Sequence, residues 1–194
     1  MKRNLMTALR MTLVTTILLG LIYPFLITAL SKTFFKDKAN GQLVTKNGVV
    51  VGSRIIAQPF TGAAYFHPRP SAAGNGYDPT NFGATNYGPT NQKLIDRIKS
   101  DVATLQAENP GKPIPVDMVT TSGSGLDPHI SPAAAGFQIP RVARARSMSQ
   151  SDVAKLIGEH TEGRQFGFLG EPRVNVLELN LALDEKFPVK TSAK

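Results

Sequence analysis

Cysteine is absent from the 194-residue sequence. The chain therefore has no disulfide, no thiolate nucleophile and no cysteine ligand for a metal ion. Because proteins without cysteine occur on either side of a bacterial-type membrane, this absence leaves the redox compartment open. With 41% hydrophobic and 19% charged residues, the sequence is long enough for one domain with a core plus an appendage.

Nucleic-acid-binding patterns are also missing, although the formal net charge is +8. The 22 lysine and arginine residues are spread along the whole chain, and no zinc-finger, RNP or basic-zipper pattern accompanies them. We interpret the densest basic group, Arg141, Arg144 and Arg146, as the solvated face of a helix rather than a phosphate or lipid site. No nucleic-acid partner is expected.

Histidine is scarce, and no metal-binding spacing occurs. His67, His129 and His160 are far apart in the sequence, and H-E-x-x-H is absent. We interpret His160 as a hydrogen-bonded residue on the apolar side of a helix. The sequence therefore predicts no metal site and no covalently bound cofactor.

One long apolar run is present. Residues 11–30 carry no charge, and at 1.5 Å per residue they would cross the roughly 30 Å hydrocarbon core of a bilayer. A cleaved signal peptide with Ala29-Leu30-Ser31 as its cleavage site is the alternative. Because such signals have apolar regions of about 7 to 15 residues, we favour a retained transmembrane helix.

Small residues and one proline recur at every fourth position of this helix, in a row formed by Thr12, Thr16, Gly20, Pro24 and Thr28. Small side chains let another backbone approach closely, which drives helix association in lipid. Pro24 frees a carbonyl that needs a neighbouring group or a local adjustment. The row predicts packing against a larger membrane protein. The alternative is a lone membrane anchor in which the small residues share one side of the helix by chance.

The side of the membrane follows from the N-terminal tail. Ten residues with three basic side chains are easier to keep in the cytoplasm than to export, although the basic residues flank the span almost evenly. We therefore place the N-terminus inside and the soluble domain outside the cytoplasm. The predicted segments are an N-terminal tail (1–10), a transmembrane helix (11–31), a linker (32–40), a soluble domain (41–190) and a C-terminal tail (191–194).

Turn signals and apolar periodicity predict mixed elements in the soluble domain. Gln42–Val51 is typical of a hairpin, because Asn47-Gly48 suits a type I′ turn. The other predicted elements are a strand over Arg54–Gln58, a helix from Thr90 to Asn109, a strand over Pro115–Thr121, a helix from Ser149 capped with Asp152, a strand over Arg173–Leu177, and Leu177–Phe187 as either a strand or a helix capped by Asn175 with Glu178. The fold class is α+β, with one N-terminal transmembrane helix followed by a single mixed α/β extracytoplasmic domain.

A short repeat lies in the proline- and glycine-rich region of residues 65–91, where regular structure is not expected. Its units are Tyr77–Asn81, Phe82–Asn86 and Tyr87–Asn91, too few for a solenoid. We expect their Thr and Asn side chains to bond the local backbone and their rings to pin the loop to a core. An extracytoplasmic module that binds an ion or a glycan here is the alternative, with Asp78 as its charged ligand.

Residues 120–135, TTSGSGLDPHISPAAA, contain the side-chain types of a hydrolytic triad. An anchored envelope hydrolase would use Ser124 or Ser131 with His129. A nucleophile elbow needs G-x-S-x-G, and Ser122 stands where its first glycine belongs. The spacing therefore disfavours a hydrolase, and no catalytic residue is assigned.

The same loop has some features of a phosphate-binding loop. Consecutive amides near its two glycines could form an anion-binding nest, but the Walker lysine is absent and Pro128 replaces the third glycine of the dinucleotide pattern. We keep the loop as a candidate nucleotide or docking site, comprising Ser122, Gly123, Ser124, Gly125, Asp127 and His129.

Several stretches resemble the C subunit of Kdp-type potassium-transporting ATPases. They are Tyr65–Ala72, Gly88–Asn91, Ser122–Pro132, His160–Arg164 and Gly167–Asn180, together with the single N-terminal span ending near Tyr23-Pro24. The resemblance covers nearly the entire chain. It departs at Gly83–Tyr87, where the family often has Ser-Gly-Gly-Ser-Asn, so the five-residue repeat is peculiar to this sequence.

The resemblance implies an accessory subunit of an ATP-driven potassium pump in the bacterial cytoplasmic (inner) membrane. Implied partners are a channel-like potassium-binding subunit, a P-type ATP-hydrolysing subunit, membrane lipid and, optionally, a small single-span peptide subunit. Potassium is then the transported ion, and the phosphorylatable D-K-T-G sequence of the partner is missing here.

The family is also described as raising the ATP affinity of the pump as a catalytic chaperone, so ATP would be engaged through the complex. The resemblance likens residues 122–132 to the signature loop of ABC transporters. A domain outside the cytoplasm cannot reach cytosolic nucleotide, so we favour assembly and stabilisation over direct nucleotide contact.

Overall fold

The computed structural model describes residues 1–188 and divides into two compact units, one ending at Val51 and one beginning at Gly52. The predicted end of the soluble domain at residue 190 and the tail 191–194 lie outside the described residues. Each unit is described by itself.

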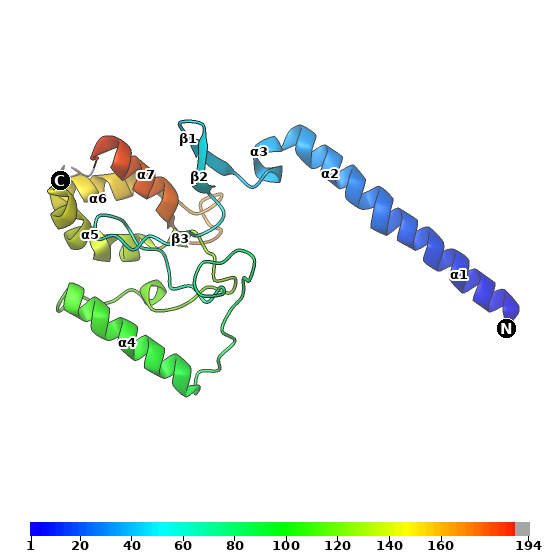
Figure 1. Cartoon of the computed structure of the whole chain (residues 1–194), viewed down its shortest axis with the longest axis horizontal. Helices are drawn as coiled ribbons and strands as arrows, with labels where there is room; N and C mark the ends of the chain where they lie inside the picture. Colours follow the sequence, from blue (N-terminus) through cyan, green and yellow to red (C-terminus); the bar gives the residue numbers. More distant parts are fainter. Residues whose placement is uncertain (189–194) are drawn as a thin grey trace. The chain divides into compact units, whose positions relative to one another are not determined.

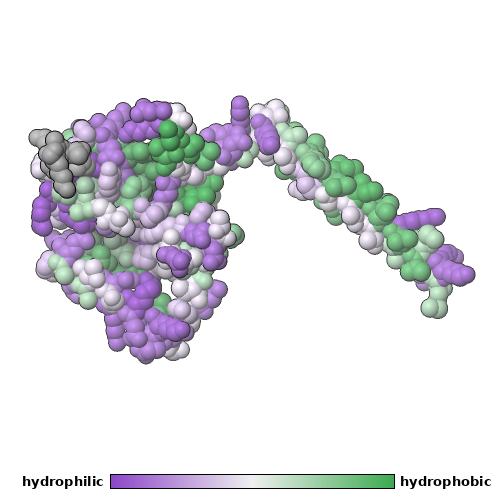
Figure 2. Space-filling view, viewed as in Figure 1, coloured by the Kyte–Doolittle hydropathy of each residue, from purple (hydrophilic) through white to green (hydrophobic). Residues whose placement is uncertain are grey.

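The first unit begins with a continuous apolar helix over residues 2–34, which is long and apolar enough to cross a membrane (Figure 1). It consists of α1 (Lys2–Ile17), a π-helical segment η1 (Leu18–Ile22) and α2 (Tyr23–Phe34). Hydrophobic side chains cover much of its surface, and hydrophilic ones gather at its N-terminal end (Figure 2). Within residues 1–188 this helix is the one candidate span, as the sequence predicts.

The π-helical segment is the local adjustment expected for Pro24. Proline has no N–H to bond the carbonyl four residues earlier, and the segment that precedes it uses longer-range bonds, such as the one from the Tyr23 N–H to the Leu18 carbonyl. The helix therefore continues through the proline.

A short helix, α3 (Lys36–Ala39), follows, and then a hairpin of β1 (Leu43–Lys46) and β2 (Val49–Ser53), the last two residues of which belong to the second unit. Asn47 and Gly48 have φ angles of 52° and 77°, so the predicted hairpin turn is confirmed.

The strand predicted over Arg54–Gln58 is wrong. Residues 54–56 form a turn in which the Ile56 N–H reaches the Ser53 carbonyl at 3.5 Å. From there to residue 91 the chain has neither helix nor strand, as expected from its glycine and proline content.

The second unit packs helices against a small antiparallel sheet, in which β5 lies between β3 and β4. Val174 of β5 is aligned with both Ile130 and Thr161. Its helices and strands are α4 (Gln92–Glu108), η2 (Val116–Met118), β3 (His129–Ile130), α5 (Pro132–Arg146), α6 (Gln150–Glu159), β4 (Thr161–Glu162), β5 (Arg173–Asn175) and α7 (Val176–Lys186).

Side-chain caps start α6 and α7 as the sequence predicts. The Ser149 hydroxyl accepts from the Asp152 N–H at 3.1 Å, and Asn175 accepts from the Glu178 N–H at 3.2 Å, so the helical alternative for residues 177–187 is confirmed. Asn91 caps α4. The predicted strand over residues 115–121 is wrong, because this segment forms the 3₁₀ turn η2.

The core lies where α5, α6 and α7 meet the sheet (Figure 1). Its fully buried side chains include Phe66, Val142, Val153, Leu179 and Leu183. Two buried amides fix the extended chain that enters this core. Asn180 pairs with both backbone groups of Phe66, at 2.8 and 2.9 Å, and Gln138 pairs with those of His67, at 2.8 and 3.1 Å. These side chains replace a sheet ladder for residues 66–67.

The interpretation of the basic group on α5 is wrong for two of its three members. The Arg146 side chain is 0% exposed and that of Arg141 is 13% exposed, whereas Arg144 faces solvent. Arg141 bonds Glu108 at 2.9 Å and the carbonyls of Ala63 and Tyr65. These guanidiniums satisfy carbonyls of a loop that has no strand partners.

Candidate functional site

The loop of residues 120–131 is fastened to the rest of the second unit by backbone hydrogen bonds. The Leu126 carbonyl accepts from Ala57, the Ser124 carbonyl from Gly83, and the Pro128 carbonyl from Val176, at 2.9 to 3.0 Å. Segments that are far apart in the sequence therefore converge on this loop.

Gly125 sits where these segments cross. It is buried, has a φ of +72°, and its carbonyl accepts from the Ser71 hydroxyl at 2.7 Å. A Cβ at this position would lie 2.8 Å from the Ala73 nitrogen and 2.9 Å from the Gly83 oxygen. Only glycine fits this conformation and this space.

Arg69 and Asp127 form the charged centre of the site. The Arg69 guanidinium donates to Asp127 Oδ2 at 3.1 Å and also to the Thr120 and Thr121 carbonyls. The other carboxylate oxygen of Asp127 accepts from the His129 N–H at 3.0 Å and lies 3.5 Å from His129 Nδ1. Burial raises the pKa of Asp127, but the hydrogen bonds from His129 and the Arg69 guanidinium outweigh it, so the pKa is lowered overall.

The serines of the loop have other partners than the imidazole. Ser124 Oγ accepts from the Leu126 N–H at 3.1 Å. Ser131 caps α5, accepting from Ala134 at 3.0 Å and donating to Asp117 at 3.1 Å. None of these bonds activates a serine for attack, so this part of the described chain does not assemble a hydrolytic triad.

One amide of the candidate nest, that of Gly125, is already used, and so is the amide of Leu126 that follows it. The Gly125 N–H reaches the Ser122 carbonyl at 3.3 Å, and the Leu126 N–H is held by Ser124 Oγ. An anion-binding nest needs its successive amides to point at the anion. These two backbone N–H groups therefore already have acceptors within the loop.

Asp127 and His129 line a shallow groove of about 570 Å³ together with Arg69, Glu171 and Arg173. The sequence analysis did not assign the last three to a site, although they lie within the stretches that carry the family resemblance. Because the groove combines both signs of charge with an apolar floor that includes Ile130, it suits a polypeptide segment better than a small anion.

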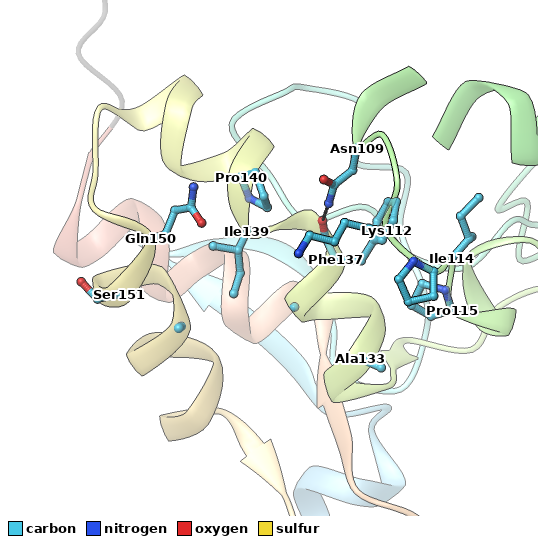
Figure 3. Close-up of a pocket in the computed structure, with 13 residues that line it drawn as sticks. Asn109, Lys112, Ile114, Pro115, Ala133, Phe137, Ile139, Pro140, Gln150 and Ser151 are labelled. Carbon is cyan, nitrogen blue, oxygen red and sulfur yellow. Dashed lines mark hydrogen bonds between the residues drawn. The ribbon is translucent and has the colours of Figure 1, made fainter. Parts of the chain in front are cut away.

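A second groove, of about 690 Å³, lies between the end of α4, residues 112–115 and the helices α5 and α6 (Figure 3). Its walls are mainly apolar, and Lys112 reaches over it toward Ile139. Asn109 closes one side by donating to the Phe137 carbonyl at 3.1 Å. Pro140 lies inside α5 at this wall, where it cannot donate to the Gly136 carbonyl.

The three repeat units are placed differently from one another. Tyr77 is tied in, since its hydroxyl donates to the Arg69 carbonyl at 2.8 Å and burial raises its pKa to about 12, whereas Phe82 and Tyr87 are exposed. Asp78 uses one carboxylate oxygen to accept from both the N–H and the hydroxyl of Thr80. The first repeat unit thus bonds its backbone through Asp78 rather than through a Thr or Asn side chain. In the third repeat unit Asn91 makes the expected kind of bond by accepting from the Lys93 N–H at 2.9 Å. Of the three rings, that of Tyr77 is partly buried and the other two are exposed.

Comparison with known proteins identifies a matching family and similar relatives. The sequence model described as "KdpC: K+-transporting ATPase, c chain" matches residues 5–185. The "Potassium-transporting ATPase KdpC subunit" of Koribacter versatilis is 68% identical over 191 residues, covering 98% of this chain and 99% of the relative. The protein of the same name from Rhodospirillum rubrum is 52% identical over 191 residues, covering 97% and 99%.

Proposed function

Because the chain belongs to the KdpC family, the c chain of K+-transporting ATPases, we propose that it is the non-catalytic subunit that assembles and stabilises the pump. Potassium is the transported ion of the complex. In this proposal the chain joins a channel-like potassium-binding subunit to a P-type ATP-hydrolysing subunit, with a small single-span peptide as an optional further partner. The loop geometry supports a non-catalytic role, because Ser124 accepts from the Leu126 N–H within the loop and Ser131 caps α5.

The single apolar helix carries this proposal. None of its residues is buried within the chain, and helices in lipid associate through close packing of small side chains. A Cβ on Gly20 would meet only the Thr16 methyl group, at 4.0 Å, so the space above Gly20 is free for the backbone of a partner. The proposed packing row is the predicted one, Thr12, Thr16, Gly20, Pro24 and Thr28.

We place the second unit outside the cytoplasm of a bacterial inner membrane, with the N-terminus inside. From that side the loop of residues 120–131 cannot meet cytosolic ATP. Any increase in the ATP affinity of the pump would then act through the packed helix, by stabilising one conformation of the ATP-hydrolysing subunit.

For the loop itself we propose a docking role. Its residues Asp127 and His129 line the mixed-charge groove, which offers donors and acceptors to a polar segment of a partner subunit. The backbone bonds that fix the loop would keep this surface in one shape, so little entropy is lost on docking.

Gly20→Leu tests the assembly role. When this variant is purified in mild detergent, we expect about tenfold less of the large subunits to co-purify with it, because the leucine side chain blocks close backbone approach. Ala29→Leu makes the same kind of change outside the row and should leave recovery unchanged. The measurement is quantitative co-purification from membranes that contain the whole pump.

Recovery of the partners at wild-type level with Gly20→Leu would refute the packing row. Failure of the unmodified chain to bring down any multi-span partner would refute the assembly role as a whole. Near-ultraviolet circular dichroism of each purified variant controls for folding of the second unit.

A further inference from the structure

The loop between β4 and β5 ends in a stiff, apolar tip at residues 165–169. Gln165 and Leu169 form an isolated antiparallel bridge with bonds of 2.8 and 2.9 Å. Between them Phe166 and Gly167 have φ angles of 54° and 83°. A left-handed conformation at a phenylalanine is costly and persists only where the surrounding bonds enforce it. The tip is thus a defined turn.

Three large apolar side chains project from this tip. Phe166 is 80% exposed, Phe168 69% and Leu169 48%. Single exposed apolar residues are common on protein surfaces, but two aromatic rings and a leucine within four residues form a convex apolar patch. Such patches mark surfaces that bind a partner or a membrane.

Two exposed ion pairs lie at the base of the tip. Arg164 bonds Glu171 at 2.7 Å, and Arg173 bonds Glu162 at 2.9 Å. The side chains of Arg164 and Glu171 are 43% and 76% exposed, and those of Arg173 and Glu162 are 56% and 51% exposed. The base therefore presents both guanidiniums and carboxylates to its surroundings, with no net charge.

We propose that this tip inserts into the interface of a phospholipid bilayer. The phenylalanine rings and Leu169 would enter the boundary between headgroups and acyl chains, where aromatic and aliphatic side chains of surface-bound segments lie. At the base, Arg164 and Glu162, which do not line the docking groove, match a zwitterionic headgroup layer, since guanidiniums bind phosphate and carboxylates bind the ammonium group.

The chemistry of the tip favours lipid over a protein pocket. The chain carries its own candidate span, so a bilayer is present wherever the protein is anchored. The docking groove nearby has charged walls and suits a polypeptide, whereas the tip is convex and apolar. This inference rests on membrane anchoring and is independent of the assembly role.

Single-tryptophan variants test the proposal, because the sequence contains no tryptophan. Phe168→Trp places the probe on the tip. Phe82→Trp is the matched control, since Phe82 is 68% exposed on another loop of the same unit. Each full-length variant is reconstituted into phosphatidylcholine vesicles with or without brominated acyl chains, and the quenching of its fluorescence is measured. Phe166→Trp serves as a second probe if Phe168→Trp fails to fold.

We expect brominated lipid to quench the tip probe at least about twofold more than the control probe, with emission shifted to shorter wavelength, because an inserted ring lies near the acyl chains. Equal quenching of the two probes would overturn the proposal. A second outcome would also overturn the proposal: brominated lipid does not quench the tip probe, and the probe becomes shielded from aqueous acrylamide only after the large subunits are added. That result would assign the tip to a protein pocket.

Discussion

At the scale of single residues, Gly125 has the strictest requirement of the loop. Its positive φ and the backbone atoms facing its α-carbon leave no room for a side chain. Gly123, two residues earlier, is exposed and would place a Cβ in open space. The two glycines look equivalent in the sequence. A phosphate nest would use the backbone amides of both, whereas the packed crossing requires the absence of a side chain only at Gly125.

Gly125→Ala should lower the free energy of unfolding by about 2–4 kcal/mol, through strain at the left-handed position and overpacking. Gly123→Ala is the control and should change it by less than about 0.5 kcal/mol. Urea unfolding of the full chain in mild detergent, followed by near-ultraviolet circular dichroism, measures both. Equal stability of the two variants would show that the crossing is not tightly packed.

Asp127 links the stability of the loop to pH. Its pKa is lowered in the folded chain, so its ionised form stabilises the fold above the unfolded pKa, near 3.8, and this contribution disappears as the pH falls through the folded pKa. We expect Asp127→Asn to lose about 1–2 kcal/mol at neutral pH through the weakened hydrogen bonds to Arg69 and His129. The gap to the wild type should narrow below about pH 4.

Unfolding curves between neutral pH and pH 3 measure that gap. The exposed Asp96, which accepts from the neighbouring Gln92 side chain, gives the control Asp96→Asn, for which a difference of less than about 0.5 kcal/mol at neutral pH is expected. A gap for Asp127→Asn that stayed constant down to pH 3 would contradict the assigned role of the carboxylate.

The residue types of the candidate site were visible in the sequence, but their partners were not. Asp127 and His129 are neighbours in the chain, so their contact could be expected. Arg69 lies 58 positions before Asp127, and no local pattern links them. The capping role of Ser131 depends on Asp117, which the sequence analysis placed in a strand. Local spacing could weaken the triad hypothesis, but only the tertiary fold supplies the actual acceptors.

At the scale of elements, α5 was predicted only in part, because the sequence analysis placed Arg141, Arg144 and Arg146 on a helix but assigned no start to that helix. Pro132, Gly136 and Pro140 lie within it, and residues of these two types disfavour a helix interior. Pro132 stands in the first turn, where its missing N–H costs nothing, and tertiary packing of Val142 and Phe137 compensates for Pro140. Periodicity alone cannot show such compensation.

Whether each of the other elements was predicted depends on how much local sequence signal it carries. The helix α4 has a long apolar stripe, and α6 has a capping box, so both were predicted. Of the three strands, β5 lies within the strand predicted over Arg173–Leu177, but it ends at Asn175 because α7 begins at Val176. The strands β3 and β4 have two residues each, which is too short for an alternating pattern, and they were not predicted. Their pairing is set by the helices packed on them.

Arg146 shows what α5 contributes to the fold. Its guanidinium bonds Asp184 of α7 at 2.8 Å and the Ala64 and Phe187 carbonyls, and it lies 4.8 Å from the centre of the Tyr65 ring. These contacts hold α7 and the loop of residues 63–65 against α5. Sequence alone could not separate this buried arginine from its exposed neighbour Arg144.

Arg146→Ala should cost about 3–5 kcal/mol of stability, because it removes a buried guanidinium that pairs with Asp184 and donates to two carbonyls. Arg144→Ala removes the same charge from the same helix at an exposed position and should cost less than about 0.5 kcal/mol. Urea unfolding separates the two. Similar losses for both variants would mean that general charge effects dominate over the buried contacts.

At the scale of the whole molecule, the absence of cysteine makes the predicted side of the membrane directly measurable. Lys99→Cys lies on the exposed side of α4, and Asn4→Cys lies near the N-terminus. In intact cells, a membrane-impermeant maleimide should label the first variant and spare the second until the cells are lysed. Labelling of Asn4→Cys alone would reverse the topology and allow contact between the loop and cytosolic nucleotide.

The whole-molecule features were the most predictable from sequence. The span is a property of composition, which needs no tertiary information, and the family resemblance rests on long motifs distributed over the chain. The second unit's core could be assigned only in part, because residues such as Gln138 and Asn180 are buried by virtue of the backbone groups they satisfy.

The π-helical segment also changes the geometry of the packing row. In a regular α-helix each step of four residues advances the side chain by about 40° around the axis, so five such positions would spread over about 160°. The π-turn between Thr16 and Pro24 holds more residues than an α-turn. Each residue there turns through a smaller angle around the axis, so the π-turn reverses part of the angular advance of the row. The proline that disrupts the hydrogen-bond pattern is thus accompanied by a rewinding that gathers the small residues into one narrow ridge along the helix.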